Sequence, residues 1–109
     1  MARHEFGIMQ TAPKPGTRYD EYEPRKYRCI SVDDDLVEPI DADLSNMECY
    51  WHTLDAPGKG LAYCGITLIP PHSIHAFIEV IRYNPALSDL LELLEQAQKE
   101  HKWVIHFGL

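Results

Sequence analysis

The sequence predicts an α+β fold, a two-layer sandwich in which two helices pack on one face of a mainly antiparallel sheet of four to five strands. Two β-rich runs at 46–54 and 61–69 flank a turn-forming segment. Two helical patterns and a strand-like C-terminal segment follow them. Strands joined by a tight turn pair antiparallel, and two amphipathic helices need an apolar sheet face to cover. The expected order of elements is β-β-β-β-α-α-β.

The N-terminal third is predicted to contain two strands joined by an irregular arm. Residues 5–10 suit a short strand, and the prolines and glycine that follow predict an arm at about 11–25. Residues 26–32 are rich in β-branched and aromatic side chains and suit a second strand. Residues 33–46 are expected to form a loop or one or two helical turns. One hypothesis is that the tyrosine-containing arm docks on a partner, so that its deletion would spare the fold.

The two β-rich runs are predicted to form a hairpin around a turn at 55–60. Folding the chain symmetrically about this turn pairs Trp51 with Cys64, and Cys49 with Ile66, on one apolar face. The alternation of apolar and polar residues in both runs agrees with this register. A slip by one residue would pair apolar with polar residues and destroy that agreement. We therefore expect the apolar face to lie under the helices and the polar face to be uncovered.

Periodicity and capping residues predict the two helices. Ser73 is expected to cap a helix whose apolar residues follow helical spacing as far as Ile81. Asn84 and Pro85 supply an N-cap and a first turn for the second helix, which carries a leucine stripe. The alternating segment at 103–109 is predicted to be a strand antiparallel to the second strand of the hairpin.

Length and composition indicate one domain over residues 1–109. Because the chain has 109 residues and 45% of them are hydrophobic, one core is feasible without metal or disulfide support. The three cysteines match no redox or zinc spacing, which favours a reducing compartment and a cytoplasmic location. The N-terminal residues lack the apolar run of a signal peptide, and no stretch is long enough to span a membrane.

The charge argues against a nucleic-acid partner. The net charge is −7, and residues 29–109 carry four Lys or Arg against thirteen Asp or Glu. Such an acidic surface repels phosphate backbones. The segment at 1–28, with six basic against four acidic residues, is too weakly basic to reverse this repulsion.

The uncovered sheet face is the candidate functional surface. Its carboxylate, imidazole and phenol groups can bind a small polar ligand or support acid–base chemistry, provided that the last strand lies beside the hairpin. Its aromatic residues also suit an interface between two copies of the chain. Such residues are equally typical of a plain solvent-facing sheet surface. The candidates are Glu48, Tyr50, His52, Tyr63, Thr67 and His106.

No motif assigns a metal, a cofactor or a catalytic residue. His72 and His75 are weak candidates for metal ligands, because their spacing lacks the arrangement of the H-E-x-x-H motif. The seven carboxylates between 33 and 48 fit no EF-hand register. Phosphate-binding glycine motifs are also absent from the sequence.

The residues support two functional hypotheses. The leading one is a non-catalytic homodimer that acts through protein contacts or binds a small-molecule ligand on the uncovered face. The alternative is a small enzyme or metal-binding protein that uses Glu48, His52 and His106. Under the alternative, replacing both histidines by alanine abolishes ligand binding or activity.

Overall fold

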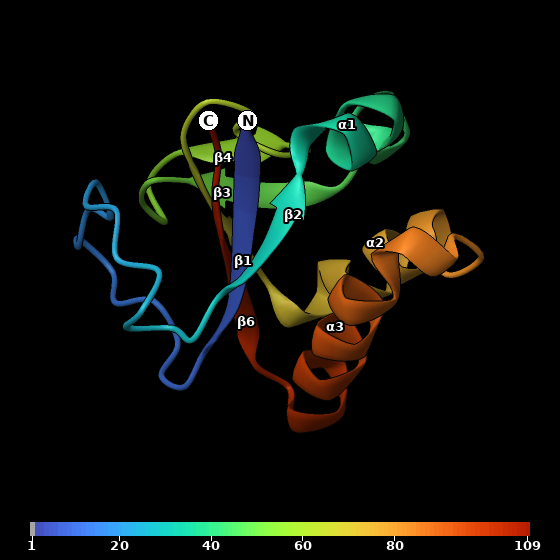
Figure 1. Ribbon diagram of the computed structural model, residues 1–109. Coiled ribbons are helices and arrows are strands. Elements are labelled where there is room, and N and C mark those ends of the chain that lie inside the picture. The colour runs from blue at the N-terminus through green and yellow to red at the C-terminus, as the bar shows by residue number, and fades with distance from the viewer. Residues whose placement is uncertain (1) are drawn as a thin grey trace.

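The computed structural model describes residues 2–109 and contains a six-stranded antiparallel sheet (Figure 1). The strands lie in the order β2-β1-β6-β5-β3-β4, and each neighbouring pair runs antiparallel. The predicted α+β class with an antiparallel sheet is confirmed, whereas the sheet has more strands than expected. The strands are β1 (Arg3–Met9), β2 (Ile30–Asp33), β3 (Glu48–Trp51), β4 (Pro57–Lys59), β5 (Ile66–Ile69) and β6 (Trp103–Phe107).

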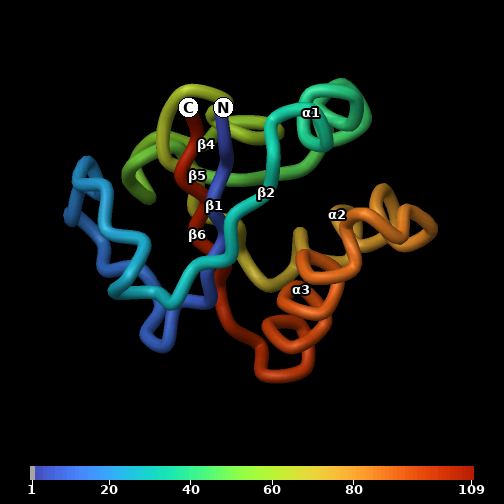
Figure 2. The backbone as a smooth tube through the Cα atoms, in the orientation of Figure 1, coloured from blue at the N-terminus to red at the C-terminus, as the bar shows by residue number. Residues whose placement is uncertain are grey.

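Two long helices, α2 and α3, lie on the same side of the sheet (Figures 1 and 2). A third, short helix, α1, directly follows β2 and was expected only as a loop or a turn or two. The observed order therefore contains one helix and one strand, β4, that the sequence did not predict as elements. No helix within residues 2–109 is long and apolar enough to cross a membrane. The helices are α1 (Asp34–Val37), α2 (Pro71–Ile81) and α3 (Ser88–Glu100), with single 3₁₀ turns at Glu38–Ile40, Ala42–Leu44 and Pro85–Leu87.

One of the two predicted helix caps is present. The side chain of Asn84 accepts a hydrogen bond from the amide of Ala86 at 3.0 Å, as expected for the residue that precedes the second helical segment. Ser73 does not cap α2, because that helix already begins at Pro71. Its hydroxyl donates instead to the carbonyl of Glu48 and so ties α2 to β3.

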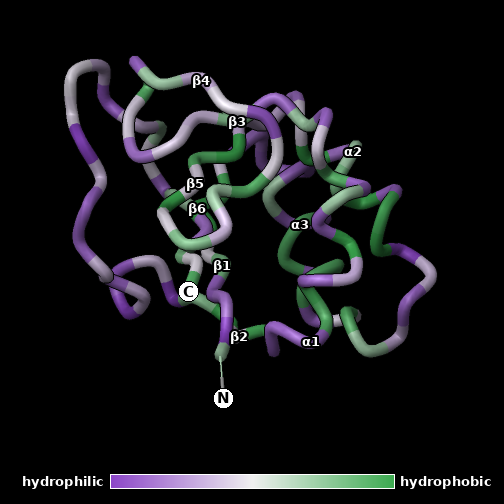
Figure 3. Tube along the Cα trace, turned by 90° about the horizontal axis from the view of Figure 1, so that it is seen from above, coloured by the Kyte–Doolittle hydropathy of each residue, from purple (hydrophilic) through white to green (hydrophobic). Residues whose placement is uncertain are grey.

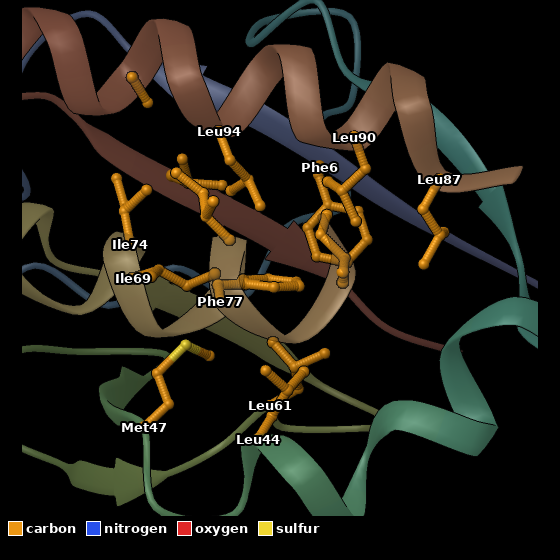
Figure 4. Close-up of a cluster of buried hydrophobic side chains, with 14 of the residues drawn as sticks. Phe6, Leu44, Met47, Leu61, Ile69, Ile74, Phe77, Leu87, Leu90 and Leu94 are labelled. Carbon is orange, nitrogen blue, oxygen red and sulfur yellow. The ribbon is translucent and has the colours of Figure 1, made fainter. Parts of the chain in front are cut away.

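The main core fills the space between the helices and the sheet (Figure 4). Phe77 of α2 packs against Phe6 of β1 with ring centroids 5.7 Å apart and the rings nearly perpendicular. The predicted leucine stripe of the second helix is buried here, at Leu87, Leu90 and Leu94. Figure 3 shows hydrophobic residues along the central strands and the helices, whereas the arm that crosses the other side of the sheet is mostly hydrophilic.

The second face of the sheet is not uncovered, because the arm at residues 10–29 folds over it (Figure 1). Tyr19, Tyr27 and Cys29 of the arm pack against apolar residues on this face. Gly7 permits the close approach: a Cβ there would lie 2.7 Å from the Cys29 sulfur. The expected open face is therefore wrong, whereas α2 and α3 pack on one face as predicted, and the arm covers the other. The apolar residues under the arm are Met9, Ile66, Leu68, Ile105 and Phe107.

The hairpin register differs from the predicted one by three residues. Trp51 pairs with Thr67, and Cys64 lies outside the strand and is exposed. An odd shift exchanges the two faces of a strand, so Thr67 turns toward the helices while Ile66 and Leu68 turn toward the arm. The shift accompanies β4, which occupies half of the expected turn and pairs with the outer edge of β3.

The last strand is antiparallel to β5, as predicted, and it also pairs with β1. β6 lies in the middle of a sheet that is covered on both faces, so the residues on both of its faces are buried and neither face is exposed to solvent. His106 was expected on an uncovered face and is fully buried. The second predicted strand, at 26–32, begins only at Ile30, because the preceding chain turns at Arg28, where φ is +50°.

Candidate functional site

A chain of hydrogen-bonded polar side chains runs through the core on the helix side of the sheet. Thr67 of β5 lies beside His106 of β6, with 3.0 Å between the Thr67 hydroxyl oxygen and Nδ1 of His106. Nε2 of His106 lies 2.9 Å from Nδ1 of His4 on β1. Nε2 of His4 lies 2.9 Å from a carboxylate oxygen of Asp34, which also accepts a hydrogen bond from Tyr63. The chain thus links three central strands to α1.

The carboxylate end of this network sets the direction of its hydrogen bonds. Asp34 can only accept, so Nε2–H of His4 donates to its carboxylate. With one proton on each ring, Nε2–H of His106 donates to Nδ1 of His4, and the Thr67 hydroxyl donates to Nδ1 of His106. The Thr67 oxygen also accepts from the amide of Ala62 at 2.8 Å.

Burial and the Asp34 carboxylate control the electrostatics of this network. Burial, and next the proximity of His4, lowers the pKa of His106 to about 3. Hydrogen bonds from Tyr63 and then from His4 lower the pKa of Asp34, and the same Asp34 carboxylate raises the pKa of Tyr63. His4, Thr67 and His106 have no exposed surface, so a ligand cannot reach them. We therefore infer that this hydrogen-bonded network of side chains, called the polar chain below, stabilises the fold and does not bind a ligand.

A different part of the sheet carries an open cavity of about 580 Å³. It lies between the arm and the strands, at the end of the sheet where both termini lie (Figure 2). We call it the arm cavity. Apolar side chains and polar groups both line it. Its principal side chains are Arg3, Glu5, Asp20, Tyr22, His52, Cys64, Ile66, Phe107 and Leu109.

His52 fastens the arm to the sheet at one side of the arm cavity. Its backbone leaves β3 with a φ of +67°, which is uncommon for a residue other than glycine. Its amide donates to the carbonyl of Ile66 at 3.0 Å, and its carbonyl accepts from the amide of Tyr19 at 2.6 Å. Nδ1 lies 3.0 Å from the Tyr19 carbonyl and 2.9 Å from the Asp20 carboxylate, so this nitrogen carries the ring proton. The imidazole is thus committed to arm contacts.

Glu5 and Tyr22 form another side of the arm cavity. The hydroxyl of Tyr22 donates to the carboxylate of Glu5, and this hydrogen bond raises the pKa of Tyr22. The Tyr22 ring meets Phe107 edge to face, with centroids 5.5 Å apart. Arg3, two residues before Glu5 on β1, turns its guanidinium toward Ser31 of β2.

The structure brings three of the six predicted site residues into one buried network and places the other three elsewhere. Only His52 lines the arm cavity. Thr67, His106 and Tyr63 belong to the polar chain, where the first two are buried. The other two lie elsewhere: Tyr50 packs near Trp103 on the arm side, and the Glu48 side chain is solvent-exposed. The six residues were chosen from a hairpin register that is shifted by three residues from the observed one. A shift by an odd number places residues expected on the same face of the sheet on opposite faces.

Several residues of both sites were not predicted. In the polar chain these are His4 and Asp34, and in the arm cavity they include Arg3, Glu5 and Asp20. The alternation of Arg3, His4, Glu5 and Phe6 is the available signal, because it places charged residues on one face of β1 and His4 with Phe6 on the other. This alternation predicts the contacts of His4 and Glu5 only when the two strands that flank β1, β2 and β6, are already known.

The cysteines and histidines do not assemble a metal centre. His72 and His75 are both exposed, and Nε2 of His72 lies 3.6 Å from a Glu48 oxygen. Within residues 2–109, no three His, Cys, Asp or Glu side chains are grouped so as to hold a metal ion. Burial raises the pKa of Cys49 to about 12.

No family model, curated protein or solved structure matches this chain. The functional argument therefore rests on the chemistry of the arm cavity.

Proposed function

We propose that this protein is a non-catalytic binding protein that holds a small molecule in the arm cavity. The observation that carries the proposal is the cavity itself. Its volume of about 580 Å³ falls within the range of about 300–1,000 Å³ that is typical of ligand sites. Ile66 and Phe107 line the cavity with small exposed parts of largely buried apolar side chains, and Glu5, Tyr22 and Asp20 contribute polar groups.

The position of the cavity also supports binding. Its walls come from two kinds of structure, rigid central strands and an arm held to them by a few hydrogen bonds. Binding residues often lie on loops that a rigid scaffold positions. The engagement of Nδ1 of His52 with Tyr19 and Asp20 favours a positioning role for that ring over acid–base chemistry. The homodimer expected from the sequence depended on an uncovered sheet face, and the proposal does not require it.

A fragment screen followed by ¹H–¹⁵N correlation spectra tests this proposal. We expect neutral and charged fragments of suitable size to shift the amide signals of Gly65, Ile66 and Gly108, which line the cavity. Alkylating the exposed Cys64 with N-ethylmaleimide should abolish these shifts, because the adduct occupies the cavity. The control is Cys64→Ser treated with the same reagent, which should still bind. The proposal is wrong if no fragment shifts these signals, or if the shifts persist after Cys64 is alkylated.

A further inference from the structure

The charges that line the arm cavity are not equally compensated. The guanidinium of Arg3 donates to the hydroxyl and the carbonyl of Ser31, and one of its nitrogens lies 3.8 Å from Asp33. The carboxylate of Asp20 lies 2.6 Å from Arg18 and 2.9 Å from His52. These two side chains therefore already have partners of opposite or complementary charge.

Glu5 differs from its neighbours in this respect. Its carboxylate accepts a hydrogen bond from Tyr22, and within residues 2–109 no Lys, Arg or His nitrogen lies within ion-pairing distance of it. It stands on β1, between β2 and β6, and is partly buried. A carboxylate that is partly withdrawn from water, with only a phenol as partner, is stabilised when a cation reaches it.

The negative charge of Glu5 raises the pKa values of two neighbouring groups. It is the main cause of the raised pKa of Tyr22, through the hydrogen bond that it accepts. Burial is the first cause of the raised pKa of Cys29, and Glu5 is the second. The anionic form of either neighbour is disfavoured beside Glu5, so a ligand anion would meet the same repulsion. A ligand cation would be attracted instead.

Aromatic rings stand next to the uncompensated carboxylate. Phe107 is paired with Glu5 across β1 and β6, and the Tyr22 ring lies edge-on against Phe107. Tyr22 is 65% exposed, so a ligand can reach its ring from the cavity. Rings of this kind attract organic cations through their π-faces. A small hydrated metal ion fits less well, because Glu5 and Tyr22 supply far fewer oxygen ligands than the six or more that calcium takes.

We propose that the ligand of the arm cavity is a small organic ammonium ion with a short apolar body. Its cationic group pairs with the Glu5 carboxylate beside the Tyr22 ring, and its apolar body lies on Phe107 and Ile66. This inference rests on the proposed function, since it names the class of molecule that the cavity binds.

Choline and its uncharged isostere 3,3-dimethyl-1-butanol provide the test. The two molecules have nearly the same shape, so any difference in affinity reports the charge. We expect choline to bind at least about tenfold more tightly in titrations followed by the amide signals of Gly65 and Gly108, because its cation is attracted by the Glu5 carboxylate and the Tyr22 ring, and tenfold corresponds to about 1.4 kcal/mol. Glu5→Gln should remove the preference, whereas Glu92→Gln, an equal charge change on the exposed side of α3, should preserve it.

The outcomes separate the ligand class from the cavity itself. Equal affinities for the two isosteres, or an unchanged preference for choline in Glu5→Gln, would overturn the proposal of a cationic ligand. Binding that is lost on Cys64 alkylation would in that case still support the proposed function. If Glu5→Gln does not fold, titrations of the unaltered protein at low and high salt replace it. Salt should then weaken choline binding and leave the alcohol unaffected, and equal effects on both would overturn the proposal.

Discussion

The imidazole rings of His4 and His106 stack with their centroids 5.1 Å apart, and a 2.9 Å contact joins Nδ1 of His4 to Nε2 of His106. Both rings are fully buried. Asp34 accepts from His4 at one end of the network, and Thr67 contacts His106 at the other, so every ring nitrogen has a hydrogen-bond partner. The pair joins β1 and β6 to α1 and requires that the His106 ring remain neutral.

This requirement predicts a loss of stability in mild acid. Burial and the neighbouring His4 lower the pKa of His106 from 6.5 to about 3. Below pH 6.5 the unfolded chain takes up a proton at this residue and the folded chain does not, so the free energy of unfolding falls as the pH decreases toward about 3. One proton gives a slope of about 1.4 kcal/mol per pH unit. Urea unfolding followed by tryptophan fluorescence should show the midpoint decreasing over this range.

An exposed histidine supplies the control for this pH dependence. His75→Gln should retain the slope of the unaltered protein, because His75 is exposed on α2. His106→Gln should flatten the slope, although it should also lower the stability at neutral pH. A midpoint that stays constant from about pH 7 to pH 5 in the unaltered protein would show that His106 takes up its proton equally in the folded and unfolded states, contrary to the prediction.

Thr67 should be important for its hydroxyl more than for its size. Thr67→Val keeps the shape but leaves the Ala62 amide and Nδ1 of His106 without a partner in the core. Unsatisfied buried groups cost about 1–3 kcal/mol each, so we expect a loss of about 2–4 kcal/mol in chemical denaturation. Thr67→Ser keeps the hydroxyl and removes one methyl group, and it should cost only about 1 kcal/mol. The polar chain would not have the stabilising role assigned here if valine proved the milder of the two substitutions.

The sequence predicted best the elements that depend on local signals. The leucine stripe from Leu87 to Leu94 and the cap at Asn84 depend on residues only a few positions apart, where helical spacing alone determines which side chains share a face. The antiparallel placement of β6 beside β5 was also predicted correctly, because two consecutive helices return the chain to the end of β5. These features need no knowledge of distant segments.

The site depended on non-local pairing, which the sequence did not determine. Matching the alternation of the two runs selected the wrong register, because the observed pairing of Trp51 with Thr67 is shifted by an odd number of residues and is accompanied by the unpredicted strand β4. The hydrophilic composition of the arm gave no sign that it covers a sheet face, since few of its side chains, among them Tyr19, Tyr22 and Tyr27, pack against that face. The arm cavity exists only between arm and sheet, so it was not predicted either.

The arm should contribute to stability, contrary to the hypothesis that it can be deleted without loss of the fold. The Tyr27 ring packs on the apolar face under the arm, 6.1 Å from the ring of Phe107. Tyr27→Ala should therefore lower the free energy of unfolding by about 1–3 kcal/mol, as expected for removing a half-buried aromatic ring. Deleting residues 11–28 should expose the whole face and increase binding of a hydrophobic dye.

Tyr83 is the matched control for the arm, because its side chain is 88% exposed. Tyr83→Ala should change the unfolding midpoint very little. Equal effects of the two substitutions, or a deletion variant with an unaltered midpoint, would show that the arm contacts do not stabilise the sheet.

The reactivity of the three cysteines tests whether the arm covers the sheet as the structure shows. Cys64 is exposed at the cavity, Cys49 is buried and Cys29 is partly buried under the arm. Burial raises the pKa of Cys49 to about 12, and burial together with the Glu5 carboxylate raises that of Cys29 to about 12. The thiolate is the reactive form, so near pH 8 only roughly one in ten thousand of such buried thiols is reactive. Iodoacetamide should therefore modify Cys64 alone in the folded protein.

Peptide mass spectrometry identifies which thiol has reacted. The folded protein should gain one adduct at Cys64, and all three cysteines should react in urea. Cys64→Ser should gain none while folded and two when unfolded. Rapid labelling of Cys29 in the folded protein would mean that the arm lifts from the sheet on the timescale of the reaction. The cavity wall that contains Tyr22 would then be absent for much of the time, and the binding proposed for this site would have to include closure of the arm over the ligand.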